Sequence, residues 1–489
     1  MYLYGTNSYM KVAIAFILLV NSLNCVAQKQ KFEGLWEGKI NAGVDLRLVF
    51  EFKTNETGTL IAKLTSPDQS ATSVKMDSAW VKDDSIFVIS PRFRISFSGV
   101  LKNDSIINGD FVQGKPFELL LKKVKVVSVQ NRPQTPIPPF SYNSEDVSFY
   151  NKGLNYGGTL TWPKKITGSN QLQLSKYPVA LLISGSGPQD RDETLFNHKP
   201  FALIADNLTK LGFAVLRVDD RGVGKSTGNF SSATTADFAD DVEAGIEFLK
   251  SNINIDTLRM GLIGHSEGGM IAPIVASRRK DINFIVLLAG PGLPIVQLMA
   301  EQAEAIAKSS GSTAAFAKSE NELYVLGATE INKHLDSSTT FHNMSTALNA
   351  WIAKQPAIIV SGLHLTSLPE RESFLHSQLG TLQSPWFKYF LSFDPTPYLV
   401  QLRCSVLALN GSKDIQVIAS SNLAGIKAAL KKSHSKSYVV KELPGLNHLF
   451  QTCKSCTARE YGDLVETFSP TALQIMDDWL LKQVGNRAH

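Results

Sequence analysis

The segment Arg259-Met-Gly-Leu-Ile-Gly-His-Ser-Glu-Gly-Gly-Met270 gives the clearest indication of the fold. Its first five residues are typical of a buried strand, and the apolar sequence from Met270 onward is typical of a helix. Between them stands Gly-x-Ser-x-Gly, a turn that holds its serine in a strained conformation and lifts the hydroxyl clear of the sheet. The pattern predicts that Ser266 is a nucleophile. A glycine-rich bend without chemistry is the simpler alternative.

Apolar strands alternate with amphipathic helices on both sides of this turn. Strand-like runs cover 177–184, 213–220 and 283–290, and helical, alanine-rich text interrupts the pattern from about 293 to 402. Such alternation predicts an α/β fold with a doubly wound parallel sheet covered on both faces. The long interruption is best explained by a helical lid. We expect this domain to span residues 144–489.

The region before this domain has a different pattern of apolar and polar residues. Over residues 31–127, about eight short runs alternate between apolar and polar residues and are separated by turn signals such as Asn55-Glu-Thr-Gly58. This pattern predicts a small all-β domain, a barrel or a sandwich, with a structural role. Its opening Gly34-Leu-Trp-x-Gly38 resembles the first strand of lipocalin-like and avidin-like barrels. Four prolines between 131 and 142 predict a stiff linker over residues 128–143.

The N-terminus has the pattern of an export signal. Lys11 precedes an apolar run, Val12–Val20, that is too short to span a bilayer, and the small residues Cys25 and Ala27 suit signal peptidase. We expect residues 1–27 to be removed and the protein to be periplasmic or secreted. A lipoprotein anchored through Cys25 is the less favoured alternative. After removal of the signal, we expect no stable membrane insertion.

Charge and cysteine content narrow the possible partners. The formal net charge is +5 over 489 residues without a basic run, so we expect no nucleic-acid partner. In an exported protein Cys453 and Cys456 are expected to form a local disulfide or to remain two thiols, leaving Cys404 free. Two cysteines do not make a structural zinc site, so no metal or other cofactor is expected.

A serine nucleophile needs a base, which is in turn held by an acid. In open α/β sheets such residues lie at the carboxyl ends of strands. The first strand after the lid region ends in Gly411-Ser-Lys-Asp414, and the next leads into Leu446-Asn-His448. We expect Asp414 to be the acid and His448 the base. His265, directly before the nucleophile, is expected to point the wrong way for a base.

The tetrahedral intermediate needs two backbone N–H donors. One is expected from Glu267, directly after the nucleophile, whose carboxylate is expected to be incidental. The other is expected from the loop Ser184-Gly-Ser-Gly-Pro-Gln189, where the Ser186 N–H is preferred and that of Gly187 is the alternative.

Several motifs together resemble those of bacterial serine esterases of the α/β-hydrolase superfamily, near the prolyl-oligopeptidase and dienelactone-hydrolase relatives. The motifs are SGSGPQDRD (184–192), VDDRGVGKS (218–226), GHSEGG (264–269) and LNHLF (446–450), and the resemblance covers about 146–483. It implies a carboxylesterase for small esters with Ser266, Asp414 and His448 as triad and no cofactor. It also suggests that Asp219 and Arg221 tie loops together, whereas Asp190 and Arg191 face substrate or bind each other.

The sequence therefore predicts an exported serine hydrolase that cleaves carboxylic esters through an acyl-enzyme. One alternative is a serine peptidase of the same superfamily, which would use the same residues on an amide. Another is a non-catalytic binding protein in which the all-β domain does the binding.

Overall fold

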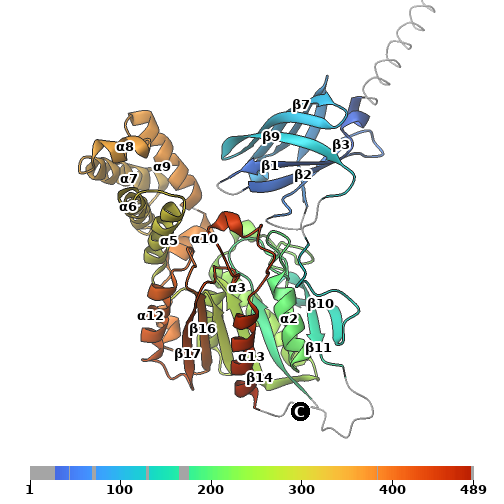
Figure 1. The fold of residues 1–489 in the computed structure, drawn as a ribbon, viewed down its shortest axis with the longest axis vertical. Helices are drawn as coiled ribbons and strands as arrows, with labels where there is room; N and C mark the ends of the chain where they lie inside the picture. The colour runs from blue at the N-terminus through green and yellow to red at the C-terminus, as the bar shows by residue number, and fades with distance from the viewer. Residues whose placement is uncertain are drawn as a thin grey trace, which may run out of the picture. The chain divides into compact units, whose positions relative to one another are not determined.

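The computed structural model describes residues 28–42, 45–68, 73–127, 131–164, 176–382 and 384–485 (Figure 1). The expected export signal, with Cys25, lies outside the described residues. The chain divides into two compact units: Met1–Asn131 with Leu195–Asn197, and Arg132–Thr194 with His198–His489. Within the described ranges no helix combines the length and the apolar character that crossing a membrane would require.

The first unit is a single antiparallel sheet. Its nine described strands follow the order β4-β3-β2-β1-β9-β8-β7-β6-β5. The strands are β1 (Gly34–Asn41), β2 (Asp45–Thr54), β3 (Leu60–Thr65), β4 (Val74–Lys75), β5 (Ser78–Lys82), β6 (Ser85–Ser90), β7 (Ile95–Asn103), β8 (Ile106–Gln113) and β9 (Lys115–Val124). The prediction of a small all-β domain is confirmed.

The two edges of this sheet are consecutive in sequence, because only Met76 and Asp77 separate β4 from β5. Three Cα steps reach at most about 10 Å, so the sheet must curl until its edges approach. β5 indeed contacts β3. The unit is therefore a curled, barrel-like sheet, not a sandwich. In the sequence, the alternation of apolar and polar residues over 73–81 predicts one continuous strand. In the structure, the chain crosses from one edge of the sheet to the other at the buried Met76.

Aromatic side chains fill the interior of the curl. Trp36, in the Gly-x-Trp-type opening, is fully buried and donates its indole N–H to the carbonyl of Phe32 at 2.6 Å. The rings of Phe50 and Phe97 stack with centroids 5.0 Å apart. Inward-facing residues thus come from strands on both sides of β1, as expected for an antiparallel sheet that has one face buried in a core.

The second unit is built on an eight-stranded sheet of order β10-β11-β13-β12-β14-β15-β16-β17. A hairpin of β10 and β11 pairs antiparallel with β13, and the strands from β13 through β17 are parallel. The strands are β10 (Asn143–Asn151), β11 (Leu154–Trp162), β12 (Tyr177–Ile183), β13 (Ala214–Val218), β14 (Ile255–His265), β15 (Phe284–Leu288), β16 (Ser405–Gly411) and β17 (Tyr438–Leu443).

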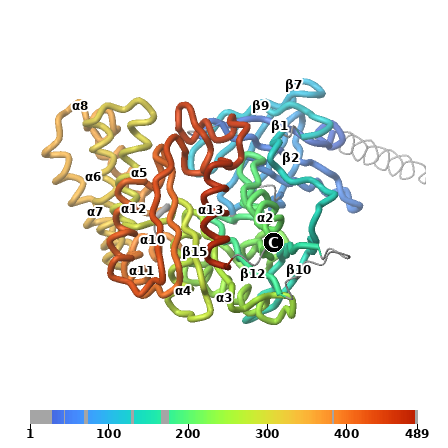
Figure 2. Tube along the Cα trace, turned by 60° about the horizontal axis from the view of Figure 1, so that its bottom comes forward, coloured from blue at the N-terminus to red at the C-terminus, as the bar shows by residue number. Residues whose placement is uncertain are grey.

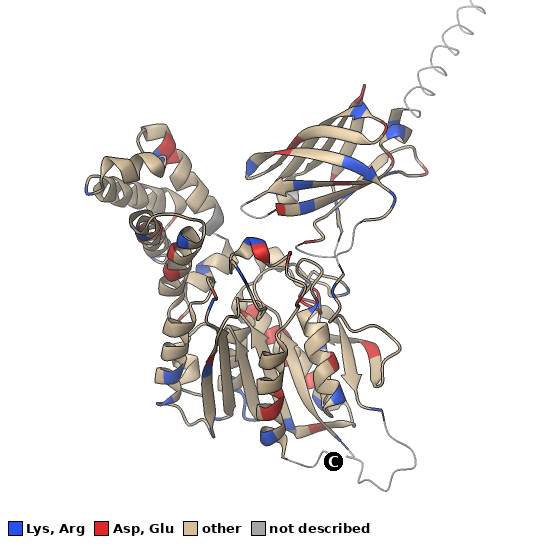
Figure 3. Ribbon diagram, in the orientation of Figure 1, with Lys and Arg blue, Asp and Glu red and all other residues tan. Residues whose placement is uncertain are grey.

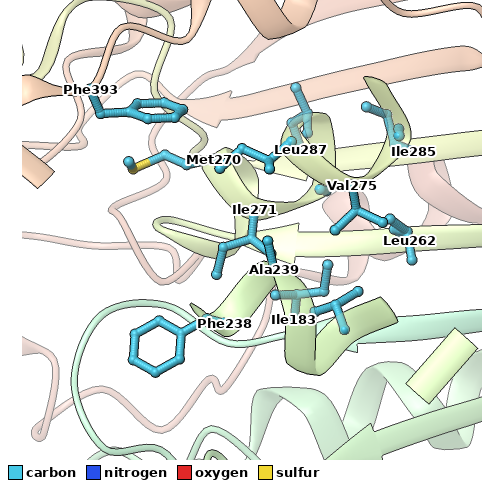
Figure 4. Packing of buried hydrophobic residues seen from close by; sticks show 14 of the residues in the cluster. Ile183, Phe238, Ala239, Leu262, Met270, Ile271, Val275, Ile285, Leu287 and Phe393 are labelled. Atoms are coloured by element: carbon cyan, nitrogen blue, oxygen red, sulfur yellow. The ribbon is translucent and has the colours of Figure 1, made fainter. Parts of the chain in front are cut away.

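Helices cover both faces of this sheet. They are α2 (Pro200–Lys210), α3 (Thr235–Ser251), α4 (Gly268–Arg278), α12 (Ala419–Leu430) and α13 (Pro470–Val484). Leu181 and Ile183 of β12 belong to a core shared with α3, α4 and α12, whereas Ala180 and Leu182 face a second core under α2 and α13. Figure 4 shows the first of these cores, where strand residues meet α4. Burial on both faces explains the continuous apolar runs of the strands.

Seven helices lie between β15 and β16 in the described chain. They are α5 (Ile295–Ser309), α6 (Ala314–Ile331), α7 (Ser337–Ile352), α8 (Ala357–Gly362), α9 (Leu368–Leu382), α10 (Pro385–Ser392) and α11 (Thr396–Leu399). Figure 2 shows this group gathered on the α12 side of the sheet. Its buried residues, Leu298 and Leu323 among them, join the core of α3 and α4. The predicted α/β fold with a helical lid is confirmed.

The proline-rich segment before β10 is bonded to the second unit. Arg132, 7% exposed, donates to the carbonyls of Gly462 and Leu464, and Gln134 bonds the backbone of Phe468. The segment is therefore anchored where it enters the hydrolase-like sheet. Positive and negative side chains are interspersed along the elements of both units (Figure 3).

Candidate active site

Ser266 occupies the turn between β14 and α4. Its φ of +53° lies in the left-handed region of backbone conformation, which residues other than glycine rarely adopt. The turn is tight: a Cβ on Gly264 would lie 2.0 Å from the carbonyl oxygen of Gly268. The Ser266 N–H donates to the carbonyl of Leu288 at 2.8 Å, which ties the turn to β15. The serine is half-buried in a conformation whose strain is maintained by its surroundings.

Asp414 and His448 meet at the carboxyl edge of the same sheet. Oδ2 of Asp414 lies 2.8 Å from Nδ1 of His448, and both residues are 4% exposed. The other oxygen, Oδ1, accepts the backbone N–H groups of Gln416 and Val417 at 2.7 and 2.9 Å. The carboxylate is thus held from its own loop and bonds the imidazole at Nδ1. That bond leaves Nε2 as the ring nitrogen able to accept a proton.

The loops that carry these two side chains approach closely because of Gly411, the last residue of β16. A Cβ there would lie 2.2 Å from the carbonyl oxygen of Leu446. The backbone also joins the loops, since the Lys413 N–H donates to Leu446 at 2.9 Å. A glycine at this position is therefore required by the contact that brings Asp414 to His448.

Ser266 directly follows His265, whose ring lies against that of His448. The centroids of the two rings are 4.9 Å apart. Among the described residues, the Ser266 hydroxyl donates no hydrogen bond to His448. Catalytic hydrogen bonds are often long or poorly aligned without substrate and tighten when it binds.

The two expected oxyanion donors are the backbone N–H groups of Glu267 and Ser186. Among the described residues, neither the Glu267 N–H nor the Ser186 N–H donates to another protein group. The Gly185 N–H, by contrast, donates to Oε1 of Glu193 at 2.7 Å. Gly185 also adjoins the nucleophile, because a Cβ there would lie 3.2 Å from the Cβ of Ser266. The loop after β12 thus reaches the elbow with unoccupied donors.

The expectation that the carboxylate of Glu267 is incidental is wrong. Glu267 is 3% exposed, and its Oε1 accepts the hydroxyl of Thr235 at 2.6 Å and the indole N–H of Trp386 at 2.8 Å. Burial raises the pKa of this carboxyl, and the hydrogen bonds from Thr235, Trp386 and Ser186 oppose that rise. Glu267 therefore ties the elbow to α3, to the oxyanion loop and to α10 of the lid. No local pattern around Ser266 points to these distant partners.

Asp219 and Arg191 form a buried ion pair at the end of β13. The Arg191 guanidinium donates to both oxygens of Asp219 at 3.0 and 2.7 Å. Burial raises the pKa of Asp219, but the hydrogen bonds from Arg191 and Lys225 outweigh it, so the pKa is lowered. Asp190 accepts two N–H groups of its own loop instead of pairing with Arg191. Arg191 is therefore occupied in tying the oxyanion loop to the sheet.

Arg221 makes the second such tie. Its guanidinium bonds both oxygens of Asp241 in α3, at 2.7 and 2.6 Å. A cavity opens between these ion pairs and the oxyanion loop. Its lining includes Gly185, Asp220 and Glu267, but neither Ser266 nor His448.

Cys453 and Cys456 form a disulfide close to the His448 loop, whereas Cys404 is a buried free thiol. Together with Glu460 the two cysteines are the described side chains that cluster in the manner of a metal site. A disulfide leaves no thiolate for a metal ion, so this cluster is not suited to one.

Comparisons with known proteins agree with the fold. A family model described as serine aminopeptidase, S33, matches residues 198–348, which include the elbow. Esterase EstD of Thermotoga maritima is 30% identical over 166 residues. That match covers 34% of this chain and 37% of the relative, so it spans little more than a third of that protein's length.

Two solved esterases resemble the chain in structure. The Pyrococcus furiosus esterase Pf2001 has a TM-score of 0.41 and 16% identity, covering 74% of this chain and 96% of the other. Est1E from Butyrivibrio proteoclasticus, solved with ferulic acid, has a TM-score of 0.40 and 15% identity, covering 69% and 99%.

The strand order and the elbow after β14 give the second unit an α/β-hydrolase fold, and the family model matched at 198–348 agrees with it. The resemblance to esterases of that superfamily, predicted from the motifs, is confirmed by the sequence matches.

Proposed function

We propose that the α/β-hydrolase domain cleaves carboxylic esters through Ser266, His448 and Asp414. The Ser266 hydroxyl attacks the ester carbonyl, and Nε2 of His448 takes its proton and passes it to the leaving alcohol. Asp414 keeps the Nδ1–H oriented and stabilises the imidazolium. The N–H groups of Glu267 and Ser186 donate to the oxyanion. Water, activated by the same imidazole, then hydrolyses the acyl-enzyme.

The observation that carries this proposal is the buried Asp414–His448 hydrogen bond of 2.8 Å beside a serine with φ of +53°. A buried carboxylate–imidazole pair and a left-handed serine each cost stability. Their occurrence together, at the carboxyl edge of a parallel sheet, is what acyl transfer requires.

An ester substrate is favoured over a peptide by the state of the nearby carboxylates. An aminopeptidase needs a carboxylate to bind the substrate's ammonium group. Here Glu193 bonds Gly185 and His265, Glu267 bonds Thr235 and Trp386, and Asp220 bonds Ser184 and Gln189 (all at 2.6–2.9 Å). Burial also raises the pKa of Glu267 and Asp220, which weakens them as anions.

Three acids of the lid are similarly occupied. Glu301 accepts the hydroxyl of Ser421, Glu304 pairs with Lys308, and Glu322 accepts the indole N–H of Trp351. The serine peptidase nevertheless remains the second candidate, because the matching family model is described as serine aminopeptidase.

Two comparisons test the proposal. p-Nitrophenyl esters of increasing acyl length should be hydrolysed much faster than alanyl and prolyl p-nitroanilides. Faster cleavage of the anilides would favour the peptidase. The Ser266→Ala variant should lose ester hydrolysis, whereas Ser277→Ala, in the helix that follows the turn, should retain it. Near-full activity of Ser266→Ala would refute the proposal.

We further propose that the protein is exported, periplasmic or secreted, with residues 1–27 as the signal. The Cys453–Cys456 disulfide supports an oxidising compartment. N-terminal sequencing of the protein from the exported fraction should begin at Gln28. A mature chain beginning with a lipid-modified Cys25 would support the lipoprotein alternative instead.

A further inference from the structure

His265, the residue before the proposed nucleophile, is buried and hydrogen-bonded at both ring nitrogens. Its Nδ1 lies 2.9 Å from Oε1 of Glu193, and its Nε2 lies 3.1 Å from the backbone carbonyl oxygen of His448. His265 and Glu193 are each 7% exposed. The proposed reaction uses neither side chain.

The partners of His265 determine where its protons must be. A backbone carbonyl only accepts hydrogen bonds, so Nε2 must carry a proton. An ionised carboxylate also only accepts, and Glu193 already accepts the Gly185 N–H at 2.7 Å through the same oxygen. Both ring nitrogens of His265 then donate, which only the imidazolium can do.

The three bonds of this pair join the three loops that form the proposed site. Glu193 holds Gly185, so that the next N–H in the oxyanion loop, that of Ser186, stays available. His265 stands in the elbow itself. Its Nε2–H holds the backbone of His448, the proposed base.

We infer that His265 is a buried imidazolium which, paired with Glu193, positions the oxyanion loop and the His448 loop around Ser266. The positioning role of His265 rests on the proposed function, because it concerns the proposed nucleophile and base. The charge state of His265 is independent of that function. His265 acts through its neighbours and is a positioning residue.

The charges that face His265 support the imidazolium. Burial disfavours the charged ring, but the carboxylates of Glu193 and Asp414 favour it more, and the pKa of His265 is raised above its usual value. The ring of His448 also lies against it, with the centroids 4.9 Å apart. Because the pKa is raised, the protonated ring of His265 stabilises the folded state at low pH. This stabilisation is lost as the pH rises through the pKa of His265 in the folded state.

The pH profile of hydrolysis should therefore have a falling limb that belongs to His265. Activity should fall with rising pH when His265 loses its proton and one of its two hydrogen bonds breaks. The neutral Glu193→Gln variant removes the charge that favours the imidazolium, so this falling limb should move to lower pH.

The kinetic test compares Glu193→Gln and His265→Gln with His198→Gln. His198 is also a buried histidine, 2% exposed, and it bonds Thr467 and the carbonyl of Tyr461. We expect the first two variants to lose about ten- to a hundredfold in kcat with little change in KM, as for removal of a charged hydrogen bond. His198→Gln should lower the Tm but keep the falling limb of the wild-type pH profile. An unmoved falling limb in Glu193→Gln would overturn the inference.

A spectroscopic test separates the inference from the proposed function. The Ser266→Ala protein, labelled with ¹⁵N-histidine, needs no turnover, and the His265 signals are assigned by their absence in the Ser266→Ala/His265→Gln double variant. We expect both ring nitrogens of His265 to be protonated in the folded protein, and one of them to lose its proton at a higher pH than in a histidine peptide. A His265 with one unprotonated nitrogen, and hence a protonated Glu193, would overturn the charge assignment even if Ser266 proves to be the nucleophile.

Discussion

Trp386, in lid helix α10, donates its indole N–H to Oε1 of Glu267, 2.8 Å away. The lid is therefore hydrogen-bonded to the residue whose N–H is the proposed oxyanion donor. A displacement of α10 would be transmitted to the elbow through this bond, because Glu267 is buried and has no water to replace the lost partner.

The Trp386→Phe variant tests this coupling. It keeps most of the aromatic bulk but leaves a buried carboxylate with one donor fewer, so we expect kcat to fall about tenfold. Trp351→Phe is the matched control, because Trp351 makes the same kind of bond to Glu322 within the lid. Equal effects of the two variants on ester hydrolysis would show that only lid stability matters.

Removing the charge of Asp414 tests the proposed triad. Asp414→Asn keeps the size of the side chain but no longer favours the Nδ1–H form of His448, and we expect kcat to fall about 10,000-fold. Asp477→Asn, at a buried position on α13, is the control and should retain the wild-type rate. A loss of less than tenfold in Asp414→Asn would assign the acid to another residue.

Asp477 itself should limit stability at neutral pH. Burial raises the pKa of this carboxyl to about 6, although Asn207 donates a hydrogen bond to it. Because the pKa in the folded state is raised, stability is lost as pH rises from about 4 through 6, and the loss is about 3 kcal/mol. Asp477→Asn should therefore raise the Tm at pH 8 and leave it nearly unchanged at pH 4. The exposed Asp478→Asn should do neither.

Gly411 should tolerate no side chain. In Gly411→Ala the new Cβ would meet the carbonyl of Leu446 at 2.2 Å and push apart the loops of Asp414 and His448. We expect a lower Tm, by an overpacking cost of about 1–3 kcal/mol, and a larger proportional loss of kcat. Gly380→Ala, in helix α9 with free space around the new Cβ, should be neutral or stabilising. A wild-type rate in Gly411→Ala would mean that the two loops need not be this close.

Thiol titration tests the cysteine assignments. Burial raises the pKa of Cys404 to about 12, so the native, unreduced protein should not react with a thiol reagent at pH 8. After unfolding without reductant, the mature chain should titrate one thiol, because Cys453 and Cys456 are joined and Cys25 has left with the signal. Three thiols would contradict the disulfide, and two would mean that Cys25 is retained.

The parts of the fold that follow from local periodicity could be predicted from the sequence. The alternating strands and helices, the interruption by lid helices and the Gly-x-Ser-x-Gly turn all have short-range patterns. The positions of Asp414 and His448 follow from one rule, that parallel strands end at a common edge. The crossing between the sheet edges at Met76 could not be predicted, because the alternation of apolar and polar residues continues through it. The crossing is recognised only from the way the curled sheet closes.

The contacts that surround the elbow could not be predicted. Glu193 is 72 residues from His265, and Trp386 is 119 residues from Glu267, so no spacing rule connects them. Glu193 directly follows the quoted oxyanion-loop motif, which was the available signal. The role of His265 depends on a backbone carbonyl of the His448 loop, and a backbone group leaves no trace in a sequence pattern.

The central claim is that Ser266 is the nucleophile, and a fluorophosphonate probe tests it most directly. Such a probe reacts with a serine only when base and oxyanion donors activate it. Peptide mass spectrometry of the labelled native protein should place one phosphonyl group on Ser266, and Ser266→Ala should remain unlabelled. A native protein that stays unreactive, or carries the label on another serine, would contradict the account; lack of any reaction would favour a binding protein.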